Sequence, residues 1–246
     1  MNELVIDAEV RRGSRGMNVR RVQEWLSLHG LHVAVDEKFG PATEAAVCRF
    51  QEKNELRANG VVAEATFAKL VAPMARATAS MTADGRRLGT LVTAYARQHL
   101  KEKPREVAGQ NRGPWVRLYM DGHEGEAWPW CAGFACFVLK QACATLGVPV
   151  PISASFSCDS LAASAKDGGI FVTEAHARNG TRVSPGDLFL SRRTASDWVH
   201  TGIVLRATDE IFETIEGNTN DEGSREGYEV CQRLRGYDKK DFIDLA

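Results

Sequence analysis

The fold of the C-terminal part of this chain is decided by the segment Trp128-Pro129-Trp130-Cys131-Ala132. Pro129 disfavours helical backbone at the residue before it and cannot sit in a helix interior, because its nitrogen carries no hydrogen. Apolar residues at helical spacing follow from Phe134 onward, which predicts a helix that begins at or near Cys131. Unpaired backbone N–H groups and the positive end of the helix dipole favour a thiolate there. The sequence therefore predicts that Cys131 is a nucleophile.

A nucleophilic thiol needs a base, and two later segments supply a histidine and a carboxylate. Residues 199–206 and 211–216 are rich in β-branched and apolar side chains and are separated by a turn-forming stretch, which predicts an antiparallel hairpin. A loop of three or five residues would place His200 directly opposite Glu216, whereas a loop of four would place Gly217 there. The first register makes His200 the base and Glu216 the carboxylate that orients it.

Five short motifs in the C-terminal part share an order and spacing with a known family. They are Gly113-Pro114, Pro129-Trp130-Cys131, Pro185-Gly186-Asp187-Leu188-Phe189, His200-Thr201-Gly202-Ile203-Val204 and Glu216-Gly217-Asn218-Thr219. From Glu106 to about Arg235 the chain thus resembles the CHAP family of papain-like cysteine hydrolases, which cut amide bonds of peptidoglycan. The related NlpC-type hydrolases usually carry a histidine where Glu216 stands, which favours the CHAP branch.

The CHAP resemblance implies both a fold and a set of site residues. The fold it implies is a papain-like α+β domain with an antiparallel sheet. The site it implies has Cys131 as nucleophile, His200 as base, Glu216 as orienting carboxylate and Asn218 as a fourth polar member. No cofactor and no metal are expected, and the residues that bind substrate are left open.

The N-terminal part carries an independent set of motifs. They are Gly13-Ser14-Arg15-Gly16-Met17-Asn18-Val19, Val22-Gln23-Glu24-Trp25-Leu26, Asp36-Glu37-Lys38-Phe39-Gly40-Pro41-Ala42-Thr43, Ala46-Val47, Phe50-Gln51 and Gly60-Val61-Val62. With them the chain from about Val10 to Pro73 resembles a small three-helix peptidoglycan-binding domain. Apolar faces around Val22, Val47 and Phe67 support three helices. A weak internal repeat places a turn before each of the last two.

These two resemblances predict an α+β protein with two domains. We expect a peptidoglycan-binding domain over residues 1–75, a linker over 76–87 and the cysteine hydrolase domain over 88–246. The linker prediction rests on a stretch of small residues between 72 and 85 that has no apolar stripe. A chain of 246 residues is long enough to bury one small and one medium core.

Charge and hydropathy exclude several classes of partner. The formal net charge of −1 gives no electrostatic footprint for nucleic acid. Five arginines between positions 11 and 21 are predicted to form a solvated face. The longest apolar run, 131–139, is too short to cross a bilayer, and the N-terminus lacks the features of a signal peptide. We therefore expect a monomer that is made in the cytoplasm without its own export signal and delivered to the cell wall, by a holin or by secretion machinery.

The remaining chemistry-bearing residues have simpler interpretations. The six cysteines show no zinc-type spacing. Cys48, Cys136 and Cys143 are predicted to be inert core thiols, whereas Cys158 and Cys231 are ambiguous. The loop 121–126 is acidic and would either bind Ca²⁺ or line the cleft ahead of Cys131. We favour a solvated loop on the substrate side, because the ligand ladder of a calcium loop is missing.

The sequence as a whole is interpreted as a peptidoglycan hydrolase that cuts an amide bond through a Cys-His-Glu thioester mechanism. It would be a stem-peptide endopeptidase, which we favour, or an N-acetylmuramoyl-L-alanine amidase, and in either case of the phage endolysin type. One alternative is an antibacterial effector toxin with the same chemistry, whose partner would be an immunity protein. Another is a wall-binding protein without catalysis. The paired carboxylates that glycosidases need are not evident.

Overall fold

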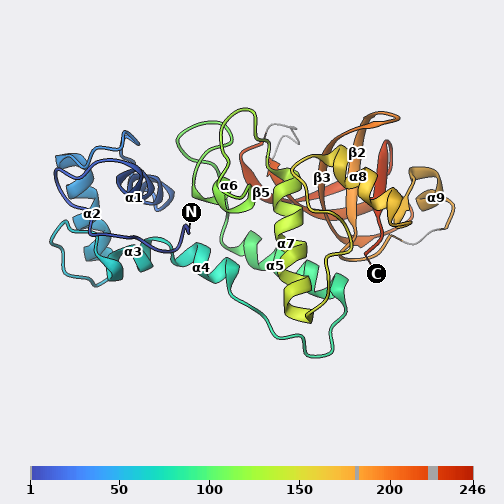
Figure 1. Cartoon of the computed structure of the whole chain (residues 1–246), viewed down its shortest axis with the longest axis horizontal. Helices are drawn as coiled ribbons and strands as arrows, with labels where there is room; N and C mark the ends of the chain where they lie inside the picture. Colours follow the sequence, from blue (N-terminus) through green and yellow to red (C-terminus); the bar gives the residue numbers. More distant parts are fainter. Residues whose placement is uncertain (1, 181–182, 221–226, 246) are drawn as a thin grey trace. The chain divides into compact units, whose positions relative to one another are not determined.

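The structure is a computed structural model that describes residues 2–180, 183–220 and 227–245. Contacts within the chain divide it into two compact units (Figure 1). The N-terminal unit holds the residues up to Arg76 together with Glu106–Gly125. The C-terminal unit holds Ala77–Arg105 and the residues from Glu126 onward. Mixed helix and antiparallel sheet, as the sequence predicted, is the architecture observed.

The N-terminal unit contains the three predicted helices, α1 (Met17–Leu28), α2 (Pro41–Lys53) and α3 (Glu64–Leu70), followed by α4 (Ala72–Thr78). Their apolar faces meet in a core of fully buried side chains, which include Val22, Val47 and Phe67. Pro41 occupies the first turn of α2, where its missing N–H costs nothing. The helical periodicity of the sequence therefore sets the core of this unit.

The weak internal repeat corresponds to two copies of one hydrogen-bonded loop. Gln23 donates to the side chains of Asp36 and Thr43, at 2.8 and 3.3 Å. Gln51 donates in the same way to Asn59 and Thr66, at 3.2 and 3.1 Å. Each glutamine is 1% exposed and also accepts two backbone N–H groups of its loop. A buried amide thus holds each turn that leads into a helix.

The segment Glu106–Gly125 differs from the predicted domain limits, because it packs with the N-terminal unit. It carries α6 (Pro114–Tyr119), whose Trp115 packs edge-on against Trp25 at a ring distance of 5.9 Å. The buried guanidinium of Arg117 pairs with Glu24 at 2.7 Å and with Glu3 at 2.9 Å. A buried arginine must be neutralised, so these carboxylates bind the segment to the N-terminal unit.

The predicted solvated face of arginines is wrong for Arg21. Its side chain is 2% exposed and lies over the ring of Phe67, with 4.9 Å between the guanidinium carbon and the ring centre. The guanidinium donates to the backbone carbonyls of Asn2 and Val5 and lies 3.5 Å from Glu3. Helix periodicity turns Arg21 inward, and the N-terminal residues supply acceptors that a count of charges does not reveal.

The predicted linker over 76–87 is partly ordered against the C-terminal unit. Its first residues belong to α4. Gln98 on α5 (Leu88–Lys101) donates to the carbonyls of Ala77 and Ala79, each at 2.9 Å. The backbone N–H of Met81 donates to the hydroxyl of Tyr95 at 2.8 Å. Side chains of α5 therefore form hydrogen bonds with backbone groups of this stretch, although its own sequence has no apolar stripe.

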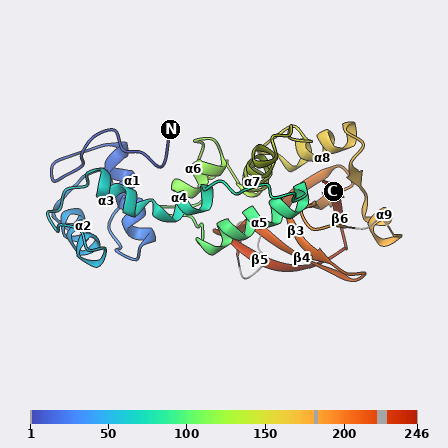
Figure 2. The same ribbon diagram turned by 90° about the horizontal axis from the view of Figure 1, so that it is seen from below.

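The C-terminal unit is built on a six-stranded antiparallel sheet with the order β1-β6-β2-β3-β4-β5. The strands are β1 (Phe171–Val172), β2 (Leu188–Thr194), β3 (Asp197–Ala207), β4 (Ile211–Thr219), β5 (Glu229–Gly236) and β6 (Lys240–Ile243). The helices besides α5 are α7 (Cys131–Leu146), α8 (Cys158–Asp167) and α9 (Glu174–Arg178). Helix α7 contacts β3 and β4, and α8 contacts β3, so both helices lie on one side of these strands (Figure 2).

The cysteines divide differently from the prediction. Cys136 and Cys143 are buried in α7, as expected of core thiols, whereas Cys48 is only partly buried. Cys158, which the sequence left ambiguous, is also buried.

None of the described helices is long and apolar enough to cross a membrane.

Candidate active site

Cys131 is the first residue of α7, as the sequence predicted. Trp130 precedes it as the N-cap and is fully buried. Strand β4 comes close to this end of the helix at Gly217, where an added Cβ would lie 2.7 Å from Cβ of Phe134 and 2.8 Å from the ring of Trp130. A glycine at this position therefore lets the sheet approach the helix closely enough for Cys131 to meet it.

His200 and Glu216 lie on the neighbouring strands β3 and β4, and the predicted hairpin between them is confirmed. Neither of the two registers that the sequence left open is observed. Ala207 pairs with Phe212, and after a bulge Ile203 pairs with Ile215; continued, this register places Gly202 opposite Glu216. The turn is tighter than expected, because Thr208 N–H already donates to the carbonyl of Ile211 at 2.8 Å.

His200 nevertheless reaches Glu216, along a diagonal across the strand pair. The Nε2 atom of His200 lies 2.8 Å from Oε2 of Glu216. Diagonal neighbours in a sheet are within reach of long side chains, provided that nothing stands between them. An added Cβ on Gly202 would lie 2.6 Å from Cγ of Glu216 and 2.9 Å from the ring of Phe189. The missing side chain of Gly202 thus leaves the space that the Glu216 side chain fills.

The other ring nitrogen of His200 is the one available to Cys131. Nδ1 is buried and makes no regular hydrogen bond with any residue that the structure describes. Cys131 and His200 still interact closely enough for each to shift the pKa of the other. Cys131 and His200 are both buried, at 4% and 6% exposed. The structure therefore brings Cys131, His200 and Glu216, the predicted nucleophile, base and orienting carboxylate, together in one cluster.

Glu216 is held by two side chains that the sequence did not single out. The guanidinium of Arg235 on β5 donates to both carboxylate oxygens, through Nε at 2.8 Å and Nη2 at 2.6 Å. The hydroxyl of Thr214 donates to Oε1 at 2.6 Å. Glu216 is completely buried, and a buried carboxylate is stable only when it is paired and hydrogen-bonded. Arginine and threonine in strands have no motif signal, so only the side-chain contacts of the structure reveal them.

The pKa shifts of the three groups agree with a thiolate–imidazolium pair. The pKa of Cys131 lies well below its ordinary value, mainly because of its contact with the Cys158 sulfur at 3.9 Å and also because of His200 and the backbone N–H of Thr201. Burial opposes the charged form of His200, but Cys131 and Glu216 outweigh it and raise its pKa to about 9. Burial opposes ionisation of Glu216 too, yet Arg235 and His200 lower its pKa to about 2. Ionised Glu216 therefore favours the charged imidazole.

Asn218 lies two residues beyond Glu216 on β4 and is 1% exposed. Its backbone is in the left-handed region, with φ of 53°, which is uncommon for a residue with a side chain. The carbonyl of Asn218 accepts the N–H of Gly227 at 3.3 Å. Asn218 thus lies two residues from Glu216 in the chain, and its part in catalysis stays a prediction.

The acidic loop 121–126 is largely exposed, as the favoured prediction of a solvated loop expected, but one of its carboxylates is engaged. Its Glu124 is engaged within the N-terminal unit, where it pairs with Arg20 at 2.7 Å and with Arg117 at 3.0 Å. The same carboxylate accepts the backbone N–H of Gly113 at 3.0 Å. Among the residues that the structure describes, no three His, Cys, Asp or Glu side chains are placed to hold a metal ion. Glu124 thus serves the buried ion-pair network.

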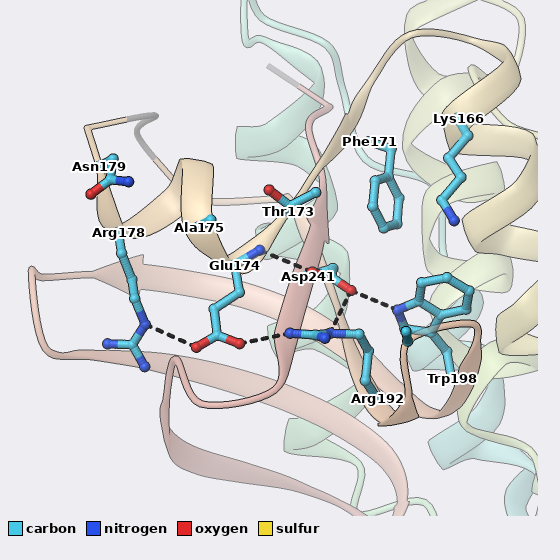
Figure 3. A pocket seen from close by; sticks show the side chains of 11 residues that line it. Lys166, Phe171, Thr173, Glu174, Ala175, Arg178, Asn179, Arg192, Trp198 and Asp241 are labelled. Atoms are coloured by element: carbon cyan, nitrogen blue, oxygen red, sulfur yellow. Dashed lines mark hydrogen bonds and ion pairs between the residues drawn. The ribbon is translucent and has the colours of Figure 1, made fainter.

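A cavity of about 780 Å³ lies at the C-terminal end of α8, where Lys166 lines it (Figure 3). The ammonium of Lys166 lies over the rings of Phe171 and Trp198, at 4.8 and 4.3 Å. Arg192 bridges Glu174 and Asp241, at 2.7 and 2.8 Å, so its charge is balanced within the wall. The described lining contains none of the four predicted site residues. Trp198 and His200 share β3, so the cavity and the cysteine site have that strand in common.

Comparison with known proteins covers the N-terminal unit best. Residues 15–70 match the family model described as "Putative peptidoglycan binding domain". Over 61 residues the chain is 44% identical to the zinc D-Ala-D-Ala carboxypeptidase of Streptomyces albus G, a match that covers 24% of each protein. The chain therefore spans about a quarter of the length of this curated relative.

Two solved structures are similar to parts of the chain. The SleB N-terminal domain is 32% identical with a TM-score of 0.27, over 27% of this chain and 93% of that one. The Burkholderia AP3 phage endolysin is 22% identical with a TM-score of 0.25, over 44% of this chain and 41% of that one. The family match and the three helices agree with the resemblance seen in the sequence. The N-terminal unit therefore carries a peptidoglycan-binding domain over residues 15–70.

Proposed function

We propose that this chain is a peptidoglycan hydrolase that cleaves an amide bond of the bacterial cell wall through a thioester on Cys131. The observation that carries the proposal is the buried cluster of Cys131, His200 and Glu216, in which a helix-terminal thiol meets an oriented histidine. Peptidoglycan as substrate is supported by the binding domain over residues 15–70. A cysteine at a helix start facing a histidine on an antiparallel sheet supports a papain-like C-terminal unit.

In the first half of the reaction, the Cys131 thiolate attacks the amide carbonyl carbon. The first backbone N–H groups of a helix have no partner within it, so the N–H of Cys131 donates to the oxyanion that forms. The His200 imidazolium gives its proton to the amide nitrogen, the carbon–nitrogen bond breaks and the amine leaves. The acyl group then remains on Cys131 as a thioester.

In the second half, neutral His200 takes a proton from water, and the resulting hydroxide attacks the thioester carbon. The carbon–sulfur bond breaks, the product leaves as a carboxylic acid that gives its proton to bulk water, and Cys131 returns to the thiolate beside the imidazolium. Glu216 holds the imidazole through Nε2 and favours its charged form in both halves. Arg235 in turn keeps Glu216 ionised. Asn218, two positions beyond Glu216 on β4, is the fourth polar residue of the proposed site.

The residues favour an amide over a glycosidic bond, because glycosidases need two carboxyl groups beside the bond and Glu216 is already committed to His200. The substrate would be a stem-peptide amide or the lactyl amide cut by an N-acetylmuramoyl-L-alanine amidase, and we favour the stem peptide. The protein would act at the cell wall after a holin releases it, as a phage endolysin. A delivered antibacterial toxin with an immunity protein would have the same chemistry.

The experiment that tests this function compares Cys131→Ala with the control Cys48→Ala on purified sacculi. Cys131→Ala is expected to lower the rate of clearing by at least about 1,000-fold, whereas the control should clear at the parent rate. Mass spectrometry of the digest should show new amino groups without new reducing sugar ends. Clearing by Cys131→Ala at the parent rate, or shortened glycan strands with every amide intact, would overturn the proposal. Either result would favour another chemistry, whereas a parent protein that binds sacculi without clearing them would favour a wall-binding protein without catalysis.

A further inference from the structure

Cys131 has a buried sulfur neighbour that the proposed hydrolysis does not use. The Sγ atom of Cys158, the first residue of α8, lies 3.9 Å from Sγ of Cys131. Both side chains are more than nine-tenths buried. A disulfide bond is about 2.05 Å long, so the two sulfurs need to approach by roughly 2 Å. Rotation about one Cα–Cβ bond can move a sulfur that far, and both residues stand at helix starts.

The two sulfurs differ in the direction of their pKa shifts. Their contact at 3.9 Å lowers the pKa of Cys131 and raises the pKa of Cys158. A thiolate is the form that attacks a peroxide oxygen, and a neighbouring thiol can then resolve the oxidised sulfur. The pair therefore has the asymmetry of an attacking and a resolving cysteine.

We propose that Cys131 and Cys158 form a reversible redox modification site, in which a hydroperoxide converts the pair to a disulfide and a dithiol reductant restores it. The modification is a different reaction from hydrolysis, and only its expected effect on activity rests on the proposed function. Because Cys131 is the proposed nucleophile, the disulfide would hold the enzyme inactive. Cys158 would also protect that nucleophile from irreversible oxidation.

The chemistry takes two steps. The Cys131 thiolate attacks one oxygen of the hydroperoxide, the O–O bond breaks, and Cys131 becomes a sulfenic acid while hydroxide, or an alkoxide from an organic peroxide, leaves. The Cys158 sulfur then attacks the Cys131 sulfur, the S–O bond breaks, and the Cys158 proton leaves with the hydroxyl as water. Each sulfur is oxidised by one electron, and the peroxide is reduced by two. A dithiol reverses the state by thiol–disulfide exchange.

Other cysteines do not share this geometry. Cys136 lies on α7 but its thiol donates to the carbonyl of Ser155 at 3.4 Å, and burial raises its pKa. Cys48 lies in the N-terminal unit. Replacement of Cys158 by serine keeps a hydroxyl donor of similar size beside Cys131 but removes the resolving sulfur. Cys158→Ser and the control Cys48→Ser therefore separate the redox role from general packing.

The test uses the full chain, reduced and then treated with one equivalent of hydrogen peroxide. Peptide mass spectrometry should show a disulfide between the peptides that contain Cys131 and Cys158, with the loss of two hydrogen atoms, in the parent and in Cys48→Ser. Dithiothreitol should remove it. In Cys158→Ser, excess peroxide should instead drive Cys131 to sulfinic acid, which dithiothreitol does not reverse. If the parent clears sacculi, its rate of clearing after peroxide and then dithiothreitol should be compared with that of Cys158→Ser. The rate recovered should be at least about tenfold lower in Cys158→Ser than in the parent.

The outcomes distinguish this inference from the proposed function. A cross-link that forms in a protein without lytic activity supports the redox site and counts against the hydrolase. Sulfinic acid at Cys131 in the parent with no cross-linked peptide, or a disulfide that joins other cysteines, would overturn the redox site. Circular dichroism of the reduced Cys158→Ser protein checks that the variant is folded, and Cys158→Ala provides a second variant if it is not.

Discussion

Replacing Arg235 by methionine is expected to destabilise the C-terminal unit by about 3 kcal/mol, because the change leaves a buried carboxylate without its main partner. Arg235 makes two hydrogen bonds to Glu216, at 2.8 and 2.6 Å, and Glu216 is 0% exposed. Loss of one partner of a fully buried pair costs about 3–5 kcal/mol. The Arg235 side chain is 21% exposed, so water offsets part of that cost and the lower figure applies.

The same change should move the acid limit of stability upward. In the folded parent the pKa of Glu216 is lowered from its ordinary value of 4.5 to about 2. Its ionisation therefore stabilises the fold above pH 4.5, and that contribution is lost as the pH falls from 4.5 through 2. Without Arg235 the pKa of Glu216 rises, so the loss should begin at a higher pH. Clearing of sacculi should decline together with it, because a protonated Glu216 no longer favours the charged form of His200.

Urea denaturation at several pH values, with clearing assays in parallel, measures both effects. The matched control is Arg206→Met, which removes an exposed pair with Glu213 at 2.6 Å, where the arginine side chain is 74% exposed. Surface pairs contribute about 0–1 kcal/mol, so this variant should behave like the parent. Equal stability of Arg235→Met and Arg206→Met, with unchanged acid limits, would refute the reasoning that Arg235 holds Glu216.

Three further perturbations test other parts of the structure. Gly202→Ala should lower the rate of clearing at least about tenfold and cost about 1–3 kcal/mol, because its Cβ would lie 2.6 Å from the Glu216 side chain; Gly236→Ala, with nothing within 4 Å, should be neutral in both assays. The pKa of His200 is raised from its ordinary value of 6.5 to about 9, so the charged imidazole should stabilise the fold fully below pH 6.5. This stabilisation should be lost as the pH rises through 9, and the rate of clearing should fall over the same pH range. Stability and rate that stay constant from pH 7 to 10 would contradict this. Arg117→Met should destabilise the N-terminal unit by about 3–5 kcal/mol in urea denaturation, against almost no change for the exposed Arg12→Met.

The sequence by itself determined the elements that depend on local pattern. Helical periodicity placed α1, α2 and α3, and Pro129 followed by apolar residues placed the start of α7 at Cys131. Two runs rich in β-branched and apolar residues on either side of a turn-forming stretch placed the hairpin of β3 and β4. These features depend on side chains within a few residues of one another, so backbone sterics and burial fix them without information from the rest of the chain.

The sequence did not determine which residues meet across the fold. The register of β3 and β4 depends on a tight turn and a bulge, which moved Gly202, and not His200, opposite Glu216. Arg235 and Cys158 entered the site from a third strand and a second helix, where no short motif marks them. Side chains that are distant in sequence become neighbours only through strand order and helix packing.

The domain limits follow the same division. A stretch of small residues predicted a break near residues 72–85, and the structure attaches part of that stretch to α5 through Gln98 and Tyr95. The segment Glu106–Gly125 joined the N-terminal unit because Arg117 needs buried carboxylates and Glu3 and Glu24 supply them. Local sequence sets the helices and strands, whereas neutralising buried charge and filling the core require partners that only the tertiary structure brings together.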